Sequence, residues 1–413
     1  MIRSMYSAIS GLRNHQTMMD VVGDNIANVN STGFKGSAVV FQDVLSQTLR
    51  GGGAATGALG GTNPAQVGLG ARLAGVTGNF SQGALQRTGR TMDIAIQGDG
   101  FFVVEQGGQM LYSRAGSFSV DALGRIVTQE GAMVQGWQAG PNGAVDAGAP
   151  VTALTVPVGD LVPPVMTSEI RLGGSLPADA ADGTALVSTV TVYDGQGNPA
   201  DLTVTFTKTA TNQWTATATQ GDPAVAVALT DSVLTFDANG ELTSPAAFQM
   251  GIAAGQVPGL GAIAVSLGQA GATERITQLG GKSTIKVLDQ DGSAAGSLQS
   301  FNVSQDGQLV GSYSNGRTRV IGQIALASFA NPEGLEKIGS SSYRATPNSG
   351  LAALGAAGAG GRGLLSTGTL EMSNVDLAQE FTNLIVAQRG FQANSRVITA
   401  ADELLSDVVN LKR

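Results

Sequence analysis

The sequence predicts an α+β protein that is mainly β, with helices only near the two ends of the 413-residue chain. Three observations support this fold class. Apolar residues recur at heptad spacing close to both termini, whereas apolar and polar residues between them alternate with period two, as they do in strands. Glycine accounts for 59 residues and charged residues for only 13%, a balance that is typical of turn-rich β structure.

The first expected element is an amphipathic helix of about 25–30 residues at the N-terminus. Its apolar residues occupy a and d positions of one heptad frame, with Gln16 and Gly23 in the remaining places. The helix is expected to end in residues 28–33, where Asn and Gly favour turns. The apolar row of this helix consists of Ile2, Met5, Ile9, Leu12, Met19 and Ile26.

The last expected element is a second amphipathic helix at the C-terminus. Ser373 or Asn374 could cap its first turn, and Asp376 supplies an acidic residue there. The two apolar rows have two interpretations that periodicity does not separate: the helices pack on each other inside one chain, or the rows are seams for other copies. The C-terminal row consists of Leu377, Phe381, Leu384, Phe391, Ile398, Leu405 and Val409.

Strands are expected where short alternating runs lie between turn signals. Residues 93–137 and 284–328 contain such runs, separated by pairs such as Asp99-Gly100 and Asp306-Gly307, which favour hairpins. In the middle of the chain we expect strands at Ala185–Tyr193 and Leu202–Thr207. Both β regions are therefore expected to be mostly antiparallel.

The change of period divides the chain into parts. Glycine- and alanine-rich segments at Gly51–Gly61 and Leu351–Gly363 are expected to be flexible connectors. The second β domain is expected to be inserted into the first. The predicted domains are a terminal helical core (1–33 and 370–413), an extended connector or loop region (34–89), a discontinuous first β domain (90–150 and 281–369) and an inserted acidic β domain (151–280).

Charge is unevenly distributed along the chain. Residues 151–280 hold eleven acidic and three basic residues and so carry the whole formal charge of −8. Nucleic acid and anionic membranes bind to basic surfaces, so neither is an expected partner of this acidic region. The region is expected to be an outward-facing module that keeps the protein soluble. No stretch approaches the roughly 20 apolar residues of a membrane span. The N-terminus lacks the apolar region of a signal peptide, so export would need a dedicated machine.

The sequence offers little catalytic chemistry. His15 is the only histidine and there is no cysteine, so a histidine- or thiolate-based metal site is not expected. Gly281-Lys282-Ser283 resembles the end of a phosphate-binding loop, but the earlier glycine that this loop requires is Ile276. Gly259–Ala264 fits GxGxxA only by its letters, without a flanking strand and helix. We therefore expect no enzyme activity, and no catalytic, cofactor-binding or metal-binding residues.

Several segments resemble a known family. Ser7–Leu12 with Asp24–Lys35, Ile94–Phe102 with Tyr112–Phe118, and Glu371–Ser395 are similar to signatures of the flagellar axial family of rod, hook and hook-associated proteins. These segments occur in the expected order at both ends of one chain. The residues that carry the resemblance include Asn25, Asn28, Gly33, Phe34, Lys35, Gly98, Gly100, Phe101, Asn374, Asp376, Gly390 and Asn394.

Length and the acidic insert favour the hook member of this family over the shorter distal rod member. The resemblance then implies a structural subunit that self-assembles into a flexible hollow tube, a universal joint that transmits motor torque from rod to filament. The terminal helices would form a coiled-coil-like core lining an export channel, with the β domains outside. The alternatives are a distal rod protein or, from another class, a secreted β-rich binding protein or enzyme.

The resemblance also implies partners and a location. The partners would be other copies of the chain, the rod and hook–filament junction proteins, a hook cap protein and the flagellar type III export apparatus. The protein would be synthesised in the cytoplasm, exported without a cleaved signal peptide and placed in the hook, outside the cell envelope. No cofactor is implied.

Overall fold

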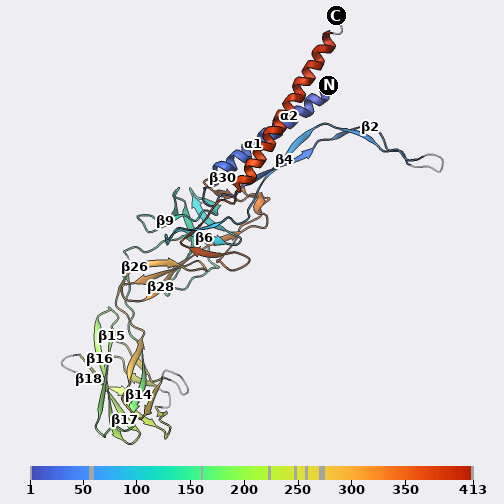
Figure 1. The fold of residues 1–413 in the computed structure, drawn as a ribbon. Helices are drawn as coiled ribbons and strands as arrows, with labels where there is room; N and C mark the ends of the chain where they lie inside the picture. Colours follow the sequence, from blue (N-terminus) through green and yellow to red (C-terminus); the bar gives the residue numbers. More distant parts are fainter. Residues whose placement is uncertain are drawn as a thin grey trace. The chain divides into compact units, whose positions relative to one another are not determined.

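The computed structural model describes residues 2–54, 60–159, 161–221, 225–245, 249–255, 259–268 and 275–410. The chain forms two compact units (Figure 1). The first contains residues 1–156, 301–311 and 319–413, and the second contains residues 157–300 and 312–318. The fold is mainly β with a helix near each end, which confirms the predicted fold class.

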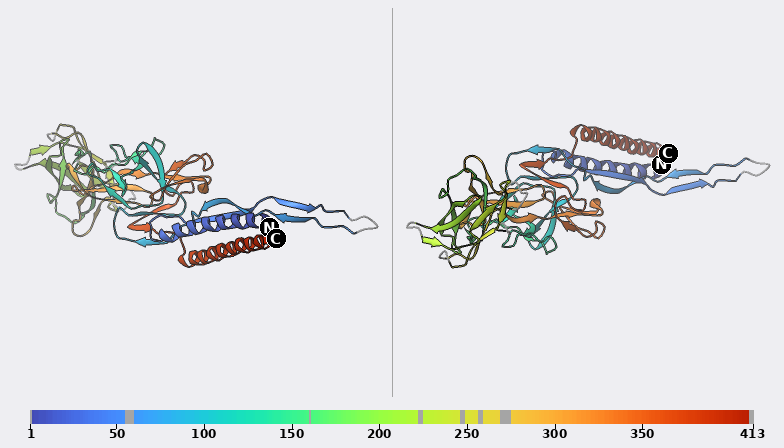
Figure 2. Two further views of the ribbon diagram at one scale, coloured as in Figure 1. Left: turned by 90° about the horizontal axis from the view of Figure 1, so that it is seen from above. Right: turned by 90° about the horizontal axis from the view of Figure 1, so that it is seen from below.

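The two helices belong to the first unit. Helix α1 (Ile2–Ala27) and helix α2 (Leu377–Asn410) lie side by side and antiparallel (Figures 1 and 2). Helix α1 ends where Asn28 donates from its side chain to the carbonyl of Asp24. The Asp376 carboxylate caps α2 by accepting from the backbone N–H groups of Ala378 and Gln379, at 2.8 and 3.2 Å. Asp376 is therefore the N-cap itself, two residues beyond the latest cap that the sequence suggested.

Residues after α1 form a long antiparallel ribbon. Strand β1 (Ser37–Asp43) pairs with β4 (Ala71–Gly78), and β2 (Ser46–Arg50) pairs with β3 (Ala65–Gly68). This ribbon occupies much of the region 34–89 that was expected to be a connector. The glycine-rich segment 51–61, of which residues 55–59 lie outside the described part, lies between β2 and β3, and Gly53 within it pairs with Thr62 just after it. It therefore closes a hairpin and links no two domains.

The rest of the first unit is built on an antiparallel sheet in the order β28-β11-β7-β8-β31-β30. Its core includes Phe101, Tyr112, Trp137 and Tyr343. Two separate strand pairs join the segment before α2 to earlier parts of the chain: β33 (Leu364–Thr367) pairs with β6 (Ile94–Gln97), and β34 (Thr369–Glu371) pairs with β5 (Leu85–Arg87). The sheet strands are β28 (Thr318–Ile324), β11 (Met133–Gln138), β7 (Phe101–Gln106), β8 (Gln109–Ser113), β31 (Ser342–Arg344) and β30 (Glu336–Gly339).

The second glycine-rich segment also lies within the first unit. Residues 351–363 contain β32 (Ala353–Gly355), which pairs with β29 (Leu326–Ser328). The Arg362 side chain donates to the carbonyls of Ala356 and Ala353. The predicted flexible connector is therefore a folded loop, because an arginine satisfies its carbonyl groups. The other strands of this unit are β5 (Leu85–Arg87), β6 (Ile94–Gln97), β9 (Phe118–Val120), β10 (Ile126–Thr128), β12 (Thr152–Ala153), β33 (Leu364–Thr367) and β34 (Thr369–Glu371), with β26 (Gly296–Val303) and β27 (Gln308–Tyr313) shared by both units.

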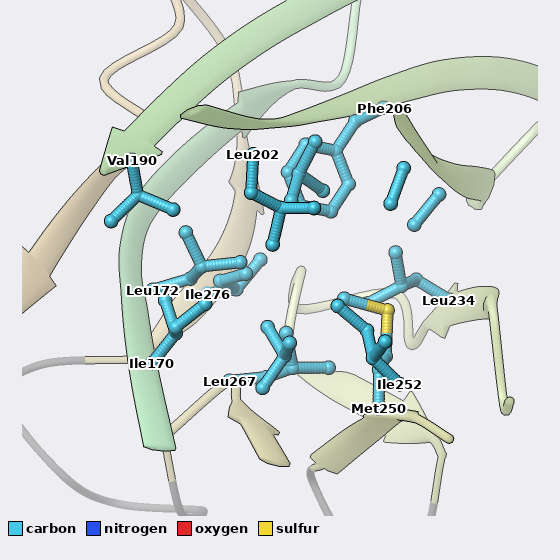
Figure 3. Packing of buried hydrophobic residues seen from close by; sticks show 14 of the residues in the cluster. Ile170, Leu172, Val190, Leu202, Phe206, Leu234, Met250, Ile252, Leu267 and Ile276 are labelled. Carbon is cyan, nitrogen blue, oxygen red and sulfur yellow. The ribbon is translucent and has the colours of Figure 1, made fainter. Parts of the chain in front are cut away.

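The second unit consists mainly of two sheets around one apolar core (Figure 3). One sheet has the order β15-β16-β17-β20-β21, and the other has the order β19-β22-β23-β14-β24. Strand β14 is the exception to antiparallel pairing, because it runs parallel to β23 and β24. The bounds are β13 (Leu161–Val162), β14 (Glu169–Pro177), β15 (Ala185–Tyr193), β16 (Pro199–Ala210), β17 (Gln213–Gln220), β18 (Val225–Val227), β19 (Leu229–Thr230), β20 (Val233–Phe236), β21 (Leu242–Ser244), β22 (Gln249–Ile252), β23 (Ile263–Ser266), β24 (Ile276–Leu279) and β25 (Lys286–Gln290).

Two features of the second unit follow from its strand pattern. Strand β15 has the bounds that the sequence predicted, and β16 extends the predicted Leu202–Thr207 at both ends. Alternation turns Lys208 toward the core, where its ammonium donates to the carbonyls of Ala178 and Ala180, each at 2.7 Å. Strand β25 pairs with β14, which explains why this unit continues past residue 280.

Candidate assembly site on the terminal helices

Small residues bring α1 and α2 into close contact. A Cβ placed on Gly11 would lie 2.7 Å from the side-chain nitrogen of Asn394, and one placed on Gly390 would overlap the His15 ring. A side chain at either position would have to displace Asn394 or His15, so glycine permits this close packing. At the other end of the pair, the Asn25 amide donates to the Glu380 carboxylate at 3.1 Å.

The other inward-facing helix residues are mostly small as well. Ala8 and Val22 on α1 fall in one row with Gly11 and His15, at spacings of three, four and seven residues, and both are buried. Ala387 and Ala401 fall in the corresponding row of α2 with Gly390 and are also buried. Spacings of three and four residues place side chains on one helix face. Among the described residues, the interface within the chain is thus built mainly from Gly, Ala, His and Asn.

On α1 the predicted apolar row is displaced by one residue, about 100° around the helix, from the row that joins α1 to α2. On α2 the predicted row adjoins the interface, because Phe391 and Ile398 lie three and four residues from Asn394. On α2, Leu377, Phe381 and Phe391 are 40%, 51% and 37% exposed. The side chains of Ile2 and Val409 lie outside the described residues. The remaining predicted residues are partly exposed, namely Met5, Ile9, Leu12, Met19, Ile26, Leu384, Ile398 and Leu405.

Sequence reasoning missed part of the exposed apolar surface. Ile385, Val386 and Leu404 on α2 are exposed to 54–57%, and Val397, at the edge of the interface with α1, is 43% exposed. A strict heptad frame passes over them, although the run Leu384-Ile385-Val386 is visible in the sequence. Helix α2 therefore carries apolar side chains over a broader surface than one row, and a water-exposed patch of this kind is typical of an interaction surface.

A buried charged cluster fastens the segment after α1 to the segment before α2. Lys35 and Glu371 are 2% and 1% exposed, and the Lys35 ammonium lies 2.6 Å from the Glu371 carboxylate. The Arg114 guanidinium lies 3.4 Å from the other carboxylate oxygen and also donates to the Gly98 carbonyl at 2.8 Å. The N–H of Gly83 donates to Glu371 as well. One carboxylate thus joins four separate segments of the chain.

Burial shifts the pKa values of groups in and beside this cluster. Burial lowers the pKa of Lys35, and the hydrogen bond and charge of Glu371 oppose that effect. Burial also lowers the pKa of Arg114, again against Glu371. Burial raises the pKa of the neighbouring Tyr343 to about 12. Because each buried charge has an opposite charge and hydrogen bonds, the cluster avoids the cost of an unpaired buried ion.

The other predicted signature residues shape the same junction. Asn25 accepts from the Ser37 N–H and donates to the Ser37 carbonyl, at 2.9 and 2.8 Å. Asn374 accepts from Gly36 N–H and donates to the carbonyls of Asn79 and Ser81. These amides replace the backbone partners that a chain loses where a helix gives way to a strand.

The signature glycines and aromatics serve close packing. Gly33 has a φ of +66°, and a Cβ there would lie 2.7 Å from the Arg114 carbonyl carbon. Gly98 and Gly100 also have positive φ values, at the turn before Phe101. The Lys337 ammonium lies 4.1 Å from the centre of the buried Phe34 ring, a cation–π contact. These residues build the junction, and none of them forms a reactive group with another.

The described residues contain no cluster of three or more histidine and acidic side chains placed to hold a metal ion, and the chain has no cysteine. In the described part of the chain, neither helix combines the length and the apolar character that crossing a bilayer requires.

Four family models match the sequence in chain order. "Flagella basal body rod protein" matches residues 5–35 and "Flagellar hook protein FlgE/F/G D1 domain" matches residues 95–170. "Flagellar basal body protein FlaE D2 domain" matches residues 172–293, and "Flagellar basal body rod FlgEFG protein C-terminal" matches residues 366–411. Together with the fold, these matches define the class: axial proteins of the bacterial flagellum.

Full-length relatives define the family more narrowly. A flagellar hook protein FlgE from Borreliella burgdorferi is 39% identical, with 100% of both chains covered, and one from Escherichia coli is 36% identical, covering 98% of this chain and 99% of the relative. A flagellar basal-body rod protein FlgG from Bacillus subtilis is 33% identical over 100% of both chains. The chain belongs to the flagellar hook protein family.

A solved structure agrees with the fold. The crystal structure of Helicobacter pylori flagellar hook protein FlgE2 matches with a TM-score of 0.53 and 15% identity, over 70% of this chain and 100% of that chain. At this identity the likeness supports the fold alone.

Proposed function

We propose that this chain is the structural subunit of a bacterial flagellar hook and polymerises through the outward surfaces of α1 and α2. The observation that supports this proposal is that different faces of the helices carry different kinds of residue. Small and polar residues join α1 to α2 within the chain, and the large apolar residues of α2, such as Phe381 and Ile385, remain exposed. Covering this surface gains about 25 cal/mol per Å² of apolar area, which favours association between copies.

The finer parts of the role follow from the family. The polymer is a flexible hollow tube that transmits torque from rod to filament, with the terminal helices in its inner, coiled-coil-like core. Its partners are other copies, the rod and junction proteins, a hook cap protein and the type III export apparatus, which secretes it without a cleaved signal peptide. Identity to hook relatives ranges from 31% to 39%, and the most similar of them exceed the 33% of the rod relative, which favours hook over distal rod.

A truncation that tests this proposal must keep the buried charged cluster around Glu371. Removing residues 370–413 would also remove Glu371 and leave Lys35 and Arg114 buried without their carboxylate. A variant that keeps residues 28–376 lacks both helices and retains the cluster. We expect it to be folded, β-rich by circular dichroism and monomeric in sedimentation at concentrations at which the full chain forms tubes. Tubes formed by this variant would contradict the proposal.

A further inference from the structure

We propose that two reciprocal contacts, Gly11 with Asn394 and His15 with Gly390, lock α1 and α2 in one register. Each contact sets a large side chain against a glycine of the other helix, and the direction alternates. Helix α1 supplies the glycine of one contact and the large residue of the other. Such a pair of complementary shapes fits only when both contacts form together.

The contacts define the register numerically. In the pairs 11 with 394, 15 with 390, and 25 with 380, the two residue numbers always add up to 405. The helices are therefore antiparallel, and their register is constant from Gly11 to Asn25. In this register Ala8 lies opposite Val397.

A slip of one helical turn would break both contacts. If α2 moved four residues in one direction, His15 would face Asn394, so that two large polar side chains would compete for the same space. If it moved four residues in the other direction, Gly11 would face Gly390 and leave a void, which costs stability. The remaining alanines of the interface are small and nearly alike, so they set no register of their own.

The large side chains are themselves held in place. The Asn394 side chain donates to the Gly390 carbonyl at 3.0 Å, which couples the two contacts through one turn of α2. The His15 ring also meets Phe41 of β1 edge-on, with ring centres 6.3 Å apart. Its Nδ1 is buried and has no hydrogen-bond partner within the described residues. Shape, more than hydrogen bonding, therefore gives His15 its place in the lock.

The lock has a consequence for assembly, and this step rests on the proposed function. The register decides which part of α1 lies beside Phe381 and Phe391, and so it fixes the composite apolar surface that the pair offers to other copies. Because α1 begins at residue 2, the position opposite its first residue is 403, and the α2 residues 404–410 extend beyond α1. His15, Gly11, Gly390 and Asn394 are thus positioning residues.

The test exchanges the two halves of one contact in the full-length chain. Gly11→Asn places an asparagine against Asn394, Asn394→Gly leaves a void, and the double variant restores one asparagine facing one glycine. The double variant keeps the composition of the two helices, so that helix propensity changes little. Gly23→Asn is the matched control, because nothing lies within 4 Å of a Cβ placed on Gly23.

The readout is a disulfide that forms only in the inferred register. The chain has no cysteine, so Ala8→Cys with Val397→Cys gives a single reportable pair, and Ala8→Cys with Ala401→Cys reports a slip of one turn. A disulfide needs Cα atoms about 4.4–6.8 Å apart, so the two reporters exclude each other. After mild oxidation, the yield of each disulfide is measured in the polymer and monomer fractions.

We expect the 8–397 disulfide to fall roughly tenfold in Gly11→Asn, to recover in the double variant and to stay unchanged in Gly23→Asn, as strongly coupled neighbouring residues should behave. Unchanged cross-linking in Gly11→Asn, or no recovery in a double variant that is folded by circular dichroism, would overturn the lock. Absence of the 8–397 disulfide in the otherwise unsubstituted chain would overturn the register. Efficient 8–397 cross-linking without tubes would count against the proposed function and leave the lock intact.

Discussion

At the scale of single residues, the Glu371 carboxylate is the anionic centre of the buried charged cluster in the first unit. It accepts from Lys35, Arg114 and the Gly83 N–H while almost fully buried. Lys35 was named among the predicted signature residues, and Arg114 and Glu371 lie within the predicted signature segments, but no contact between them was predicted. Sequence alone gave no reason to pair Lys35 with an acid 336 positions away, because that pairing depends on how β34 returns to the segment after α1.

Glu371→Gln should destabilise the first unit by about 3–5 kcal/mol, because it leaves two cations buried without their counter-ion. Chemical denaturation followed by fluorescence measures the change. Glu336→Gln is the matched control. Glu336 and Arg344 form an ion pair with both side chains about half exposed, so the loss should be at most about 1 kcal/mol. Equal losses in the two variants would show that burial does not give Glu371 its importance.

Tyr343 should make stability fall in alkaline solution. Because burial raises the folded pKa of the Tyr343 hydroxyl to about 12 from the ordinary 10.0, the protonated hydroxyl is favoured in the fold. The contribution of Tyr343 to the free energy of unfolding is complete below pH 10 and is lost as the pH rises to 12, by about 2–3 kcal/mol in total. Tyr343→Phe should remove this part of the alkaline loss, measured as unfolding free energy against pH. Tyr6→Phe, at an exposed tyrosine, is the control. An identical alkaline loss in Tyr343→Phe and the unsubstituted chain would refute this assignment.

At the scale of elements, the helices were predictable and their mutual interface was not. Heptad periodicity of apolar residues predicts the rows through Leu12 and Phe391, and these rows flank the contact between the helices. The contact itself uses Gly11, His15 and Asn394, which apolar periodicity does not indicate because they are small or polar. The ribbon of β1–β4 was missed because its strands carry glycines and largely exposed side chains, so that no buried face produces alternation.

Phe391→Asp should prevent polymer formation while leaving the β-rich fold intact. The change places a charge on a surface that must lose its water in the polymer, and a carboxylate pays heavily for that loss. Gly195→Asp introduces the same charge in an exposed turn of the second unit, where a Cβ would meet nothing within 4 Å, and should still assemble. Electron microscopy of concentrated protein measures both. Tubes of normal length from Phe391→Asp would contradict the assignment of this surface.

At the scale of the whole molecule, the acidic residues of the second unit lie largely in its turns. Asp194 accepts from the N–H groups of Gln196 and Asn198, and Asp237 accepts from those of Asn239 and Glu241. The Asn198 side-chain amide, together with these N–H groups, holds the pKa of the Asp194 carboxyl below its usual value, and the Glu241 and Asn239 N–H groups do the same for Asp237, so both stay ionised. The outer face of β15–β17 carries mainly threonines, with Thr203 paired to Thr189 and Thr219, and Asp201 accepts from Thr191 on the same face. The total charge can be counted from the sequence, but only the fold separates the acidic turns from this mainly threonine face.

The second unit should fold by itself, but only with boundaries set by β25. We expect residues 157–300 to unfold cooperatively with a β-type circular dichroism spectrum. The shorter fragment 151–280 lacks β25, which pairs with Ile170–Gly173 of β14, and should melt at a clearly lower temperature. Thermal denaturation of both fragments decides. Equal melting temperatures would show that β25 adds nothing to this unit.

The central claim is that the exposed apolar side chains of α2 join different copies while the Gly11–Asn394 row joins the helices of one copy. Near-atomic electron cryomicroscopy of tubes assembled from the full chain tests it most directly. The account predicts that Phe381 and Phe391 are covered by helices of neighbouring copies and that residues 11 and 394 of one copy remain in contact. Tubes in which these phenylalanines face solvent, or in which Gly11 packs against Asn394 of another copy, would contradict it.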